Sequence, residues 1–88
     1  MSELSLQQNF ENAVAESKNL NSRPSNDVLL QLYSLYKQST EGDNNSEPPS
    51  NPFDFVSKAK YGAWEELKGL SKEEAMQRYI DLVTKLKG

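Results

Sequence analysis

Apolar residues recur every three or four positions along this chain, and this spacing restricts its fold more than any other feature of the sequence. Near the start of the chain, one narrow arc of a helical wheel gathers the side chains of Leu6, Phe10, Ala13, Val14 and Leu20. No stretch alternates apolar and polar residues as a half-buried strand does. A chain of 88 residues also has room for only one small core. We therefore predict a single all-α domain.

Helix-breaking residues divide the periodic pattern into four segments, which we predict as helices over residues 4–20, 26–40, 53–68 and from 71 to the end of the chain. Ser2 or Ser5 can cap the first helix. Pro24 breaks the chain after it, and Gly42 is placed to terminate the second helix. Four amphipathic helices pack naturally as a four-helix bundle, which is the architecture we predict.

The connection between the second and third helices, residues 42–51, contains no apolar residue and several breakers, which indicates a solvated loop. Its length suggests that these two helices do not form an adjacent hairpin. Asn51 and Pro52 resemble a cap followed by proline at the first helical position. Ser71 and Glu74 form a capping box at the start of the fourth helix.

The chain contains neither cysteine nor histidine, which removes thiolate nucleophiles, the usual general base and the commonest zinc ligand. We therefore expect neither an enzyme nor a metal site, and no residue pattern indicates a cofactor. The net charge of −3 disfavours general nucleic-acid binding. The longest aliphatic run, from Val28 to Leu30, is too short to span a membrane, and the first residues lack the features of a signal peptide. We expect a cytoplasmic protein.

The second helix carries an unusually wide apolar surface. Its apolar and aromatic residues span an arc of roughly 200° on the wheel: Val28, Leu29, Leu30, Leu32, Tyr33, Leu35 and Tyr36. Either this helix is central and buried on most sides, or its side with Leu30, Tyr33 and Lys37 faces a binding partner. Lys37 favours the second interpretation, because an unpaired buried lysine is rare and costly.

The third helix contains a similar lysine. Lys60 shares a stripe with Trp64, where it either extends along its stem into water or faces an anion held between helices. Lys58 lies on a different flank and would join such a site only if the helix starts late or bends. Lysine suits a phosphate, tyrosine a planar base and leucine a hydrocarbon, so an acyl nucleotide conjugate would satisfy all three. Single-stranded nucleic acid and an acidic protein partner stay open on this evidence.

Three blocks of sequence are specific enough to compare with a known family. They are Tyr33 to Thr40 followed by Gly42 and Asp43, then Lys58 to Gly69, then Ser71 to Ile80. In order and spacing these blocks resemble the acyl-CoA-binding protein family, over essentially the whole chain. The resemblance implies an acyl-CoA-binding domain over residues 1–88, with a four-helix bundle as its fold. It also implies a monomer that carries and buffers long-chain acyl-CoA inside the cell without acting on it.

The resemblance further implies a role for individual residues. Tyr36 would stack on the adenine, while Tyr33, Lys37 and Lys60 would hold the ribose 3′-phosphate. By the same resemblance Lys18 would border the adenine and Tyr79 would line the ligand channel. Leu29 and Leu30 would lie near the acyl chain in a groove between helices. The predicted ligand set is Lys18, Leu29, Leu30, Tyr33, Tyr36, Lys37, Lys58, Lys60 and Tyr79, and Phe10 would help to close the groove.

Each of these residues also has a purely structural interpretation. Tyr79 lies on the apolar stripe of the fourth helix and could belong to the core, and Lys18 could be a solvated flank. Tyr61 stands where many family members carry tryptophan, which weakens the expected stacking there. Two other functions stay open, a helical protein-interaction module and a thioesterase, although no histidine accompanies any serine in the thioesterase case.

Overall fold

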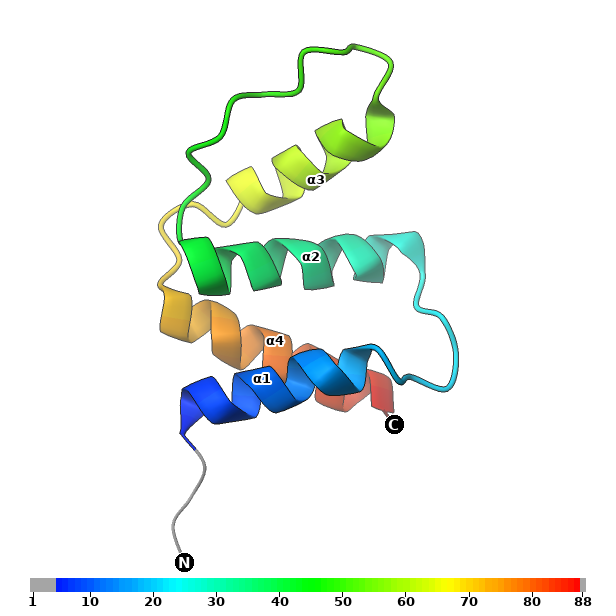
Figure 1. The fold of residues 1–88 in the computed structure, drawn as a ribbon, viewed down its shortest axis with the longest axis vertical. Helices are drawn as coiled ribbons and strands as arrows, with labels where there is room; N and C mark the ends of the chain where they lie inside the picture. Colours follow the sequence, from blue (N-terminus) through cyan, green and yellow to red (C-terminus); the bar gives the residue numbers. More distant parts are fainter. Residues whose placement is uncertain (1–4, 88) are drawn as a thin grey trace, which may run out of the picture.

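The computed structural model describes residues 5–87, which form four helices in an all-α arrangement (Figure 1). The helices are α1 (Leu6–Ser17), α2 (Asn26–Glu41), α3 (Phe55–Glu65) and α4 (Lys72–Lys87). No strand occurs among the described residues. The predicted four-helix fold is therefore confirmed. The predicted helix start at Leu4 and the alternative cap Ser2 lie outside the described residues.

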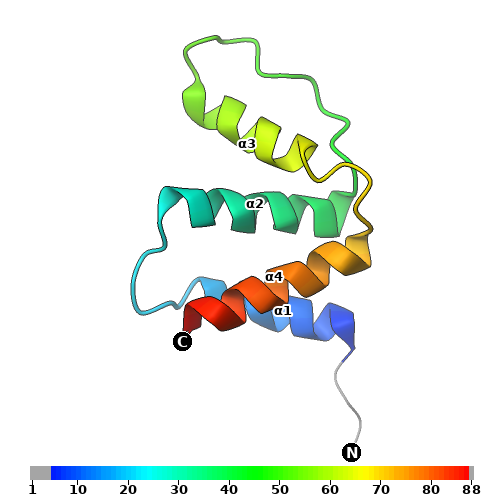
Figure 2. The same cartoon turned by 180° about the vertical axis from the view of Figure 1, so that it is seen from behind.

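The helices form two parallel pairs. In both views α2 and α3 run in one direction, and α1 and α4 run in the other (Figures 1 and 2). The connection between α2 and α3 therefore returns to the end where α2 begins, passing outside α3 in both views, which explains why it is long. The two helices are neighbours without being a hairpin, as the length of this loop predicts. Helix α2 packs against both α3 and α4, while α1 packs against α4.

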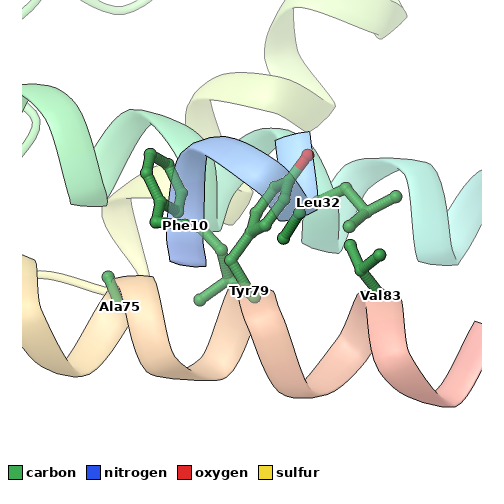
Figure 3. Close-up of a cluster of buried hydrophobic side chains, with 7 residues drawn as sticks. Phe10, Leu32, Ala75, Tyr79 and Val83 are labelled. Atoms are coloured by element: carbon green, nitrogen blue, oxygen red, sulfur yellow. The ribbon is translucent and has the colours of Figure 1, made fainter. Parts of the chain in front are cut away.

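The hydrophobic core lies between α1, α2 and α4 (Figure 3). Its buried members are Phe10, Ala13, Leu32, Leu35, Ala75, Tyr79 and Val83. Helix α3 contributes no residue to this cluster, and its one buried side chain is Trp64. The wide apolar arc of α2 thus has two uses, because one side faces the core and the other faces α3.

Three predicted helix ends differ from the structure by two or more residues, and one of them is the end of α3, which lies at Glu65 instead of Lys68. Helix α1 ends at Ser17, with Lys18 as its cap, instead of reaching residue 20. Helix α3 begins at Phe55, because the carboxylate of Asp54 accepts a hydrogen bond from the Ser57 backbone N–H at 3.1 Å. The carboxamide of Asn51 instead accepts from the Phe53 backbone N–H at 2.9 Å and stabilises a turn. Asn51 and Pro52 were therefore the wrong start for this helix.

Side-chain caps fix the starts of α1 and α4 as the sequence predicts. The Ser5 hydroxyl accepts from the Gln8 backbone N–H at 3.1 Å. At α4, the Ser71 hydroxyl accepts from the Glu74 backbone N–H at 3.0 Å. The Glu74 carboxylate binds Arg78 at 3.3 Å, so only half of the predicted capping box is formed. Each such cap stabilises its helix by about 1 kcal/mol.

A buried hydrogen-bond network ties the end of α3 to α2. Trp64 Nε1 donates to Gln38 Oε1 at 3.1 Å and to the Gly42 carbonyl at 2.9 Å. Gln38 is fully buried, and its Nε2 donates to the Leu70 carbonyl at 2.7 Å and to Asp43 Oδ1 at 2.9 Å. The C-terminal end of α3 is therefore fastened, while its N-terminal half remains exposed.

Asp43 should make the stability of the fold depend on pH in the acid range. Hydrogen bonds from the Gly69 backbone N–H and the Gln38 carboxamide hold the pKa of the Asp43 carboxyl below its ordinary value of 3.8. A depressed pKa contributes stability above about pH 4, and this contribution is lost as the pH falls through the folded-state pKa. We expect Asp43→Asn to flatten the fall in melting temperature between about pH 5 and pH 2.5.

Circular dichroism melts across that pH range provide the measurement. Asp81→Asn serves as the matched control, because Asp81 is an exposed carboxylate bonded only to Gln77. A residual slope should persist, because hydrogen bonds from Ser57 also lower the pKa of the Asp54 carboxyl. Identical pH profiles for Asp43→Asn and the wild type would contradict the role given to this carboxylate.

Candidate ligand site between α2 and α3

A cleft of about 650 Å³ lies between α2 and α3. It is lined by Arg23, Asn26, Leu29, Leu30, Tyr33, Phe55, Val56, Ala59 and Lys60. This volume falls within the range of about 300–1,000 Å³ that is usual for small-molecule sites. The cleft lies beside the exposed N-terminal half of α3, whereas the C-terminal end of this helix is tied to α2 through Trp64. Of the predicted ligand residues, Leu29, Leu30, Tyr33 and Lys60 are among those that line it.

Two lysine–aromatic pairs connect the helices at one end of this cleft. Lys60 Nζ lies 5.2 Å from the centroid of the Tyr33 ring. Lys37 Nζ lies 5.0 Å from the centroid of the Trp64 ring. Tyr33 and Lys37 are one turn apart on α2, and Lys60 and Trp64 are one turn apart on α3. Because the helices are parallel, the two pairs occupy successive turns. Lys60 and Tyr33 line the cleft, whereas Lys37 and Trp64 lie one turn beyond its lining.

Lys37 is paired with an acidic side chain of its own helix. Its ammonium group forms an ion pair with Glu41, one turn further along α2. The hydrogen bond to Glu41 raises the pKa of Lys37, although partial burial opposes this effect. The Lys37 side chain is 25% exposed and is therefore still reachable from solvent. An anion that approaches it must compete with the Glu41 carboxylate.

Tyr36 precedes Lys37 on α2 and is not among the residues that line the cleft. Its ring stacks on Phe10 with the centroids 6.0 Å apart and an interplanar angle of 27°. Tyr36 nevertheless stays 41% exposed. A ring with one covered face and one accessible side is suited to stacking against a planar group.

Tyr79 does not line the cleft. It is 4% exposed and belongs to the core, where its ring meets Phe10 edge-on at 5.2 Å (Figure 3). Its hydroxyl donates to Ser17 Oγ at 3.0 Å. Burial raises the pKa of the Tyr79 phenol, and the bond with Ser17 lowers it to a smaller extent. The core interpretation of this residue therefore holds.

The two remaining predicted lysines also lie away from the cleft lining. Lys18 is exposed at the C-terminal cap of α1. Lys58 Nζ donates to the Pro52 carbonyl at 3.2 Å, so its side chain turns back towards the loop before α3. The late start of α3 does not bring Lys58 into the site.

Several lining residues were not among the predicted ligand residues. Phe55 and Val56 stand at the start of α3 and are 71% and 65% exposed. Two adjacent large apolar residues after a polar loop are the signal that could have indicated them, because neighbouring exposed apolar side chains can mark a ligand site. Arg23 reaches the cleft from the turn before α2, and no periodicity argument predicts such a contact.

A second, smaller cavity of about 450 Å³ lies where α2, α3 and α4 meet. Its floor is apolar and includes Leu30, Leu35 and Leu82, but Glu66, Arg78, Asp81 and Lys85 give its rim both signs of charge. Among the described residues, no group of three acidic, histidine or cysteine side chains could hold a metal ion. Within the same part of the chain, every helix is too short or too polar to cross a bilayer.

Comparisons with known proteins give a consistent result. The family model described as acyl-CoA-binding protein matches residues 7–83. Acyl-CoA-binding protein homolog 1 of Caenorhabditis elegans is 49% identical over 77 residues, which is 88% of each chain. A crystal structure of Oryza sativa acyl-CoA-binding protein 2 superposes with a TM-score of 0.87 and 40% identity, and the match covers 93% of this chain and 90% of the rice chain.

One relative is much longer than this chain. Enoyl-CoA delta isomerase 2 of Rattus norvegicus is 52% identical over 80 residues, which is 91% of this chain and 20% of the isomerase. The similarity therefore covers about a fifth of that enzyme.

Proposed function

The chain belongs to the acyl-CoA-binding protein family, and from this premise we propose that it carries long-chain acyl-CoA, one molecule at a time, in the cleft between α2 and α3. The observation that supports this most strongly is the division of the cleft into two chemical parts. Its lining is apolar at Leu29, Leu30, Phe55 and Val56 and carries Tyr33 and Lys60 at one end. Lys37 and Tyr36 lie one turn further along α2, just beyond this lining. An acyl-CoA molecule has the same division between its hydrocarbon and its nucleotide.

The nucleotide would occupy the lysine end. Tyr36 offers the exposed ring on which the adenine stacks. Lys37 and Lys60 would bind the ribose 3′-phosphate as point charges, with the Tyr33 hydroxyl as a further donor. Lys18 and Lys58 would enter only if their side chains turn towards the bound nucleotide. Lys58 would first have to leave the Pro52 carbonyl.

The acyl chain would follow the apolar part of the cleft. Leu29 and Leu30 form one wall on α2, and Phe55 and Val56 form the other on α3. From Leu29 to Lys37 the helix rises by about 12 Å, which separates the hydrocarbon from the phosphate along one axis. Covering Phe55 and Val56 would also remove from water two apolar side chains that are 71% and 65% exposed.

The second cavity fits this ligand less well. Its rim mixes acidic and basic side chains, and no aromatic ring lines it for a base to stack on. The absence of histidine and cysteine also supports carriage over turnover, since no activated nucleophile is evident. We accordingly propose a monomeric cytoplasmic carrier that shields its ligand without hydrolysing it.

Calorimetry with matched chain lengths tests this proposal. Palmitoyl-CoA should bind with a stoichiometry of one and at least about a hundredfold more tightly than palmitate, because the free acid has neither base nor phosphates. The extra affinity corresponds to about 3 kcal/mol or more from the nucleotide contacts. Bound palmitoyl-CoA should release thiol no faster than palmitoyl-CoA in buffer.

Either of two results would overturn the proposal. Comparable affinity for palmitate and palmitoyl-CoA would mean that the lysine end does not recognise the nucleotide. Thiol release that scales with protein concentration and survives repurification would mean that the protein is a thioesterase. Circular dichroism of the titrated sample should show the same helical content before and after ligand addition.

A further inference from the structure

The Tyr36 ring, on which we propose that the adenine stacks, belongs to a column of aromatic side chains from three helices. Tyr36 of α2 stacks on Phe10 of α1 at 6.0 Å, and Phe10 meets the ring of Tyr79 of α4 at 5.2 Å. The Tyr79 hydroxyl donates to Ser17 Oγ at 3.0 Å, and Ser17 Oγ donates to the Val14 carbonyl at 2.7 Å. We name Tyr36, Phe10 and Tyr79 the aromatic column.

Only the outer end of this column is accessible. Tyr36 is 41% exposed, whereas Phe10 is 2% and Tyr79 is 4% exposed. Phe10 therefore cannot touch a ligand itself, but it covers one face of the ring that would. Its edge-on contact with Tyr79 prevents it from rotating freely, because the phenol of Tyr79 is fixed by its hydrogen bond to Ser17.

We propose that Phe10 is a positioning residue for ligand binding, which acts by fixing the plane of the Tyr36 ring. This inference rests on the function proposed above and assigns part of it to α1, a helix that lines neither cavity. A stacking ring that is already oriented loses little conformational freedom when a base arrives. The same arrangement gives buried Tyr79 a part in binding through Phe10, without direct ligand contact.

Phe10→Leu tests the proposal, because leucine keeps the position apolar but removes the planar face. Stacked aromatic pairs contribute enough that palmitoyl-CoA affinity should fall about two- to tenfold. In a Tyr36→Ala background the same substitution should change the dissociation constant less than about twofold, because the ring that Phe10 positions is gone. Such coupling distinguishes positioning from a general loss of core packing.

Val83→Ala is the matched control. Val83 is 1% exposed in the same core, and Figure 3 places it at the other end of the cluster from Phe10. This variant should lower the melting temperature and leave the affinity for palmitoyl-CoA unchanged. The NMR resonances of the Tyr36 ring protons should shift in Phe10→Leu and stay in place in Val83→Ala, and this readout needs no ligand.

Each outcome of these measurements decides between the alternatives. Equal loss of affinity from Phe10→Leu with and without Tyr36, or equal loss from Val83→Ala, would overturn the positioning role. Wild-type protein that fails to bind palmitoyl-CoA would instead overturn the proposed function, while the ring-proton shifts still report on the column. If Phe10→Leu does not fold, Phe10→Met keeps more of the buried volume and carries the same expectations.

Discussion

Trp64→Ala should lower the free energy of unfolding by about 3–5 kcal/mol, the usual cost of truncating a buried tryptophan. Trp64 is the one buried side chain of α3, at 6% exposure, so its loss removes the buried contact that this helix makes with α2. A domain of 88 residues has a total stability of only about 4–13 kcal/mol. The melting temperature should therefore fall by more than about 12 °C. Thermal and urea unfolding followed by circular dichroism give both values.

Trp64→Phe separates the packing of the ring from its hydrogen bonds. Phenylalanine keeps an aromatic ring but has no donor for Gln38 Oε1 and the Gly42 carbonyl. We expect this variant to lose about 1–3 kcal/mol, the cost of leaving such acceptors unsatisfied. A loss below about 1 kcal/mol for Trp64→Ala would show that α3 is held by contacts other than this tryptophan.

The helices and the core were predictable because their signal is local. Apolar residues that recur every three to four positions show which face of a helix is buried, and this pattern can be read within a single helix. Leu32 and Leu35 on α2 and Val83 on α4 could be identified in this way. The start of α3 was predicted at the wrong residue, because Asn51 and Asp54 are both good caps and only the tertiary structure chooses between them.

The hydrogen-bond network was not predictable from periodicity. Gln38 bonds to Trp64 and Leu70, which lie 26 and 32 residues further along the chain. The spacing of apolar residues gives no information on hydrogen-bond partners that are so far apart in the sequence. The one available signal is the position of Gln38, which falls on the same buried arc as Leu35 and therefore needs polar partners inside the protein.

The candidate site was predicted in part. The wheel of α2 and the stripe of α3 place Tyr33, Lys37 and Lys60 on facing surfaces, and the structure agrees. The direction of the Lys58 side chain depends on the Pro52 carbonyl, which belongs to an irregular turn. The burial of Tyr79 depends on Phe10 from another helix. Contacts of both kinds arise only from the tertiary fold.

Substituting Lys37 and Lys60 together should cause the largest loss of affinity. Each charge-assisted contact with a phosphate contributes about 1.5–3 kcal/mol net. Lys37→Gln combined with Lys60→Gln should therefore weaken palmitoyl-CoA binding by about 10²–10⁴-fold. Lys85→Gln is the matched control, because it removes a lysine from the rim of the second cavity and should leave the affinity unchanged.

The most direct measurement compares palmitoyl-CoA with palmitoyl-dephospho-CoA, which lacks the 3′-phosphate, by calorimetry on the wild type and on this double variant. The wild type should bind the dephospho ligand far more weakly than palmitoyl-CoA, and the double variant should bind both ligands with affinities within about tenfold of each other. Tyr36→Ala should weaken both ligands, because both contain adenine. If the lysine substitutions reduce the affinity for the two ligands by the same factor, Lys37 and Lys60 do not bind the 3′-phosphate, and the proposed recognition of the nucleotide is wrong.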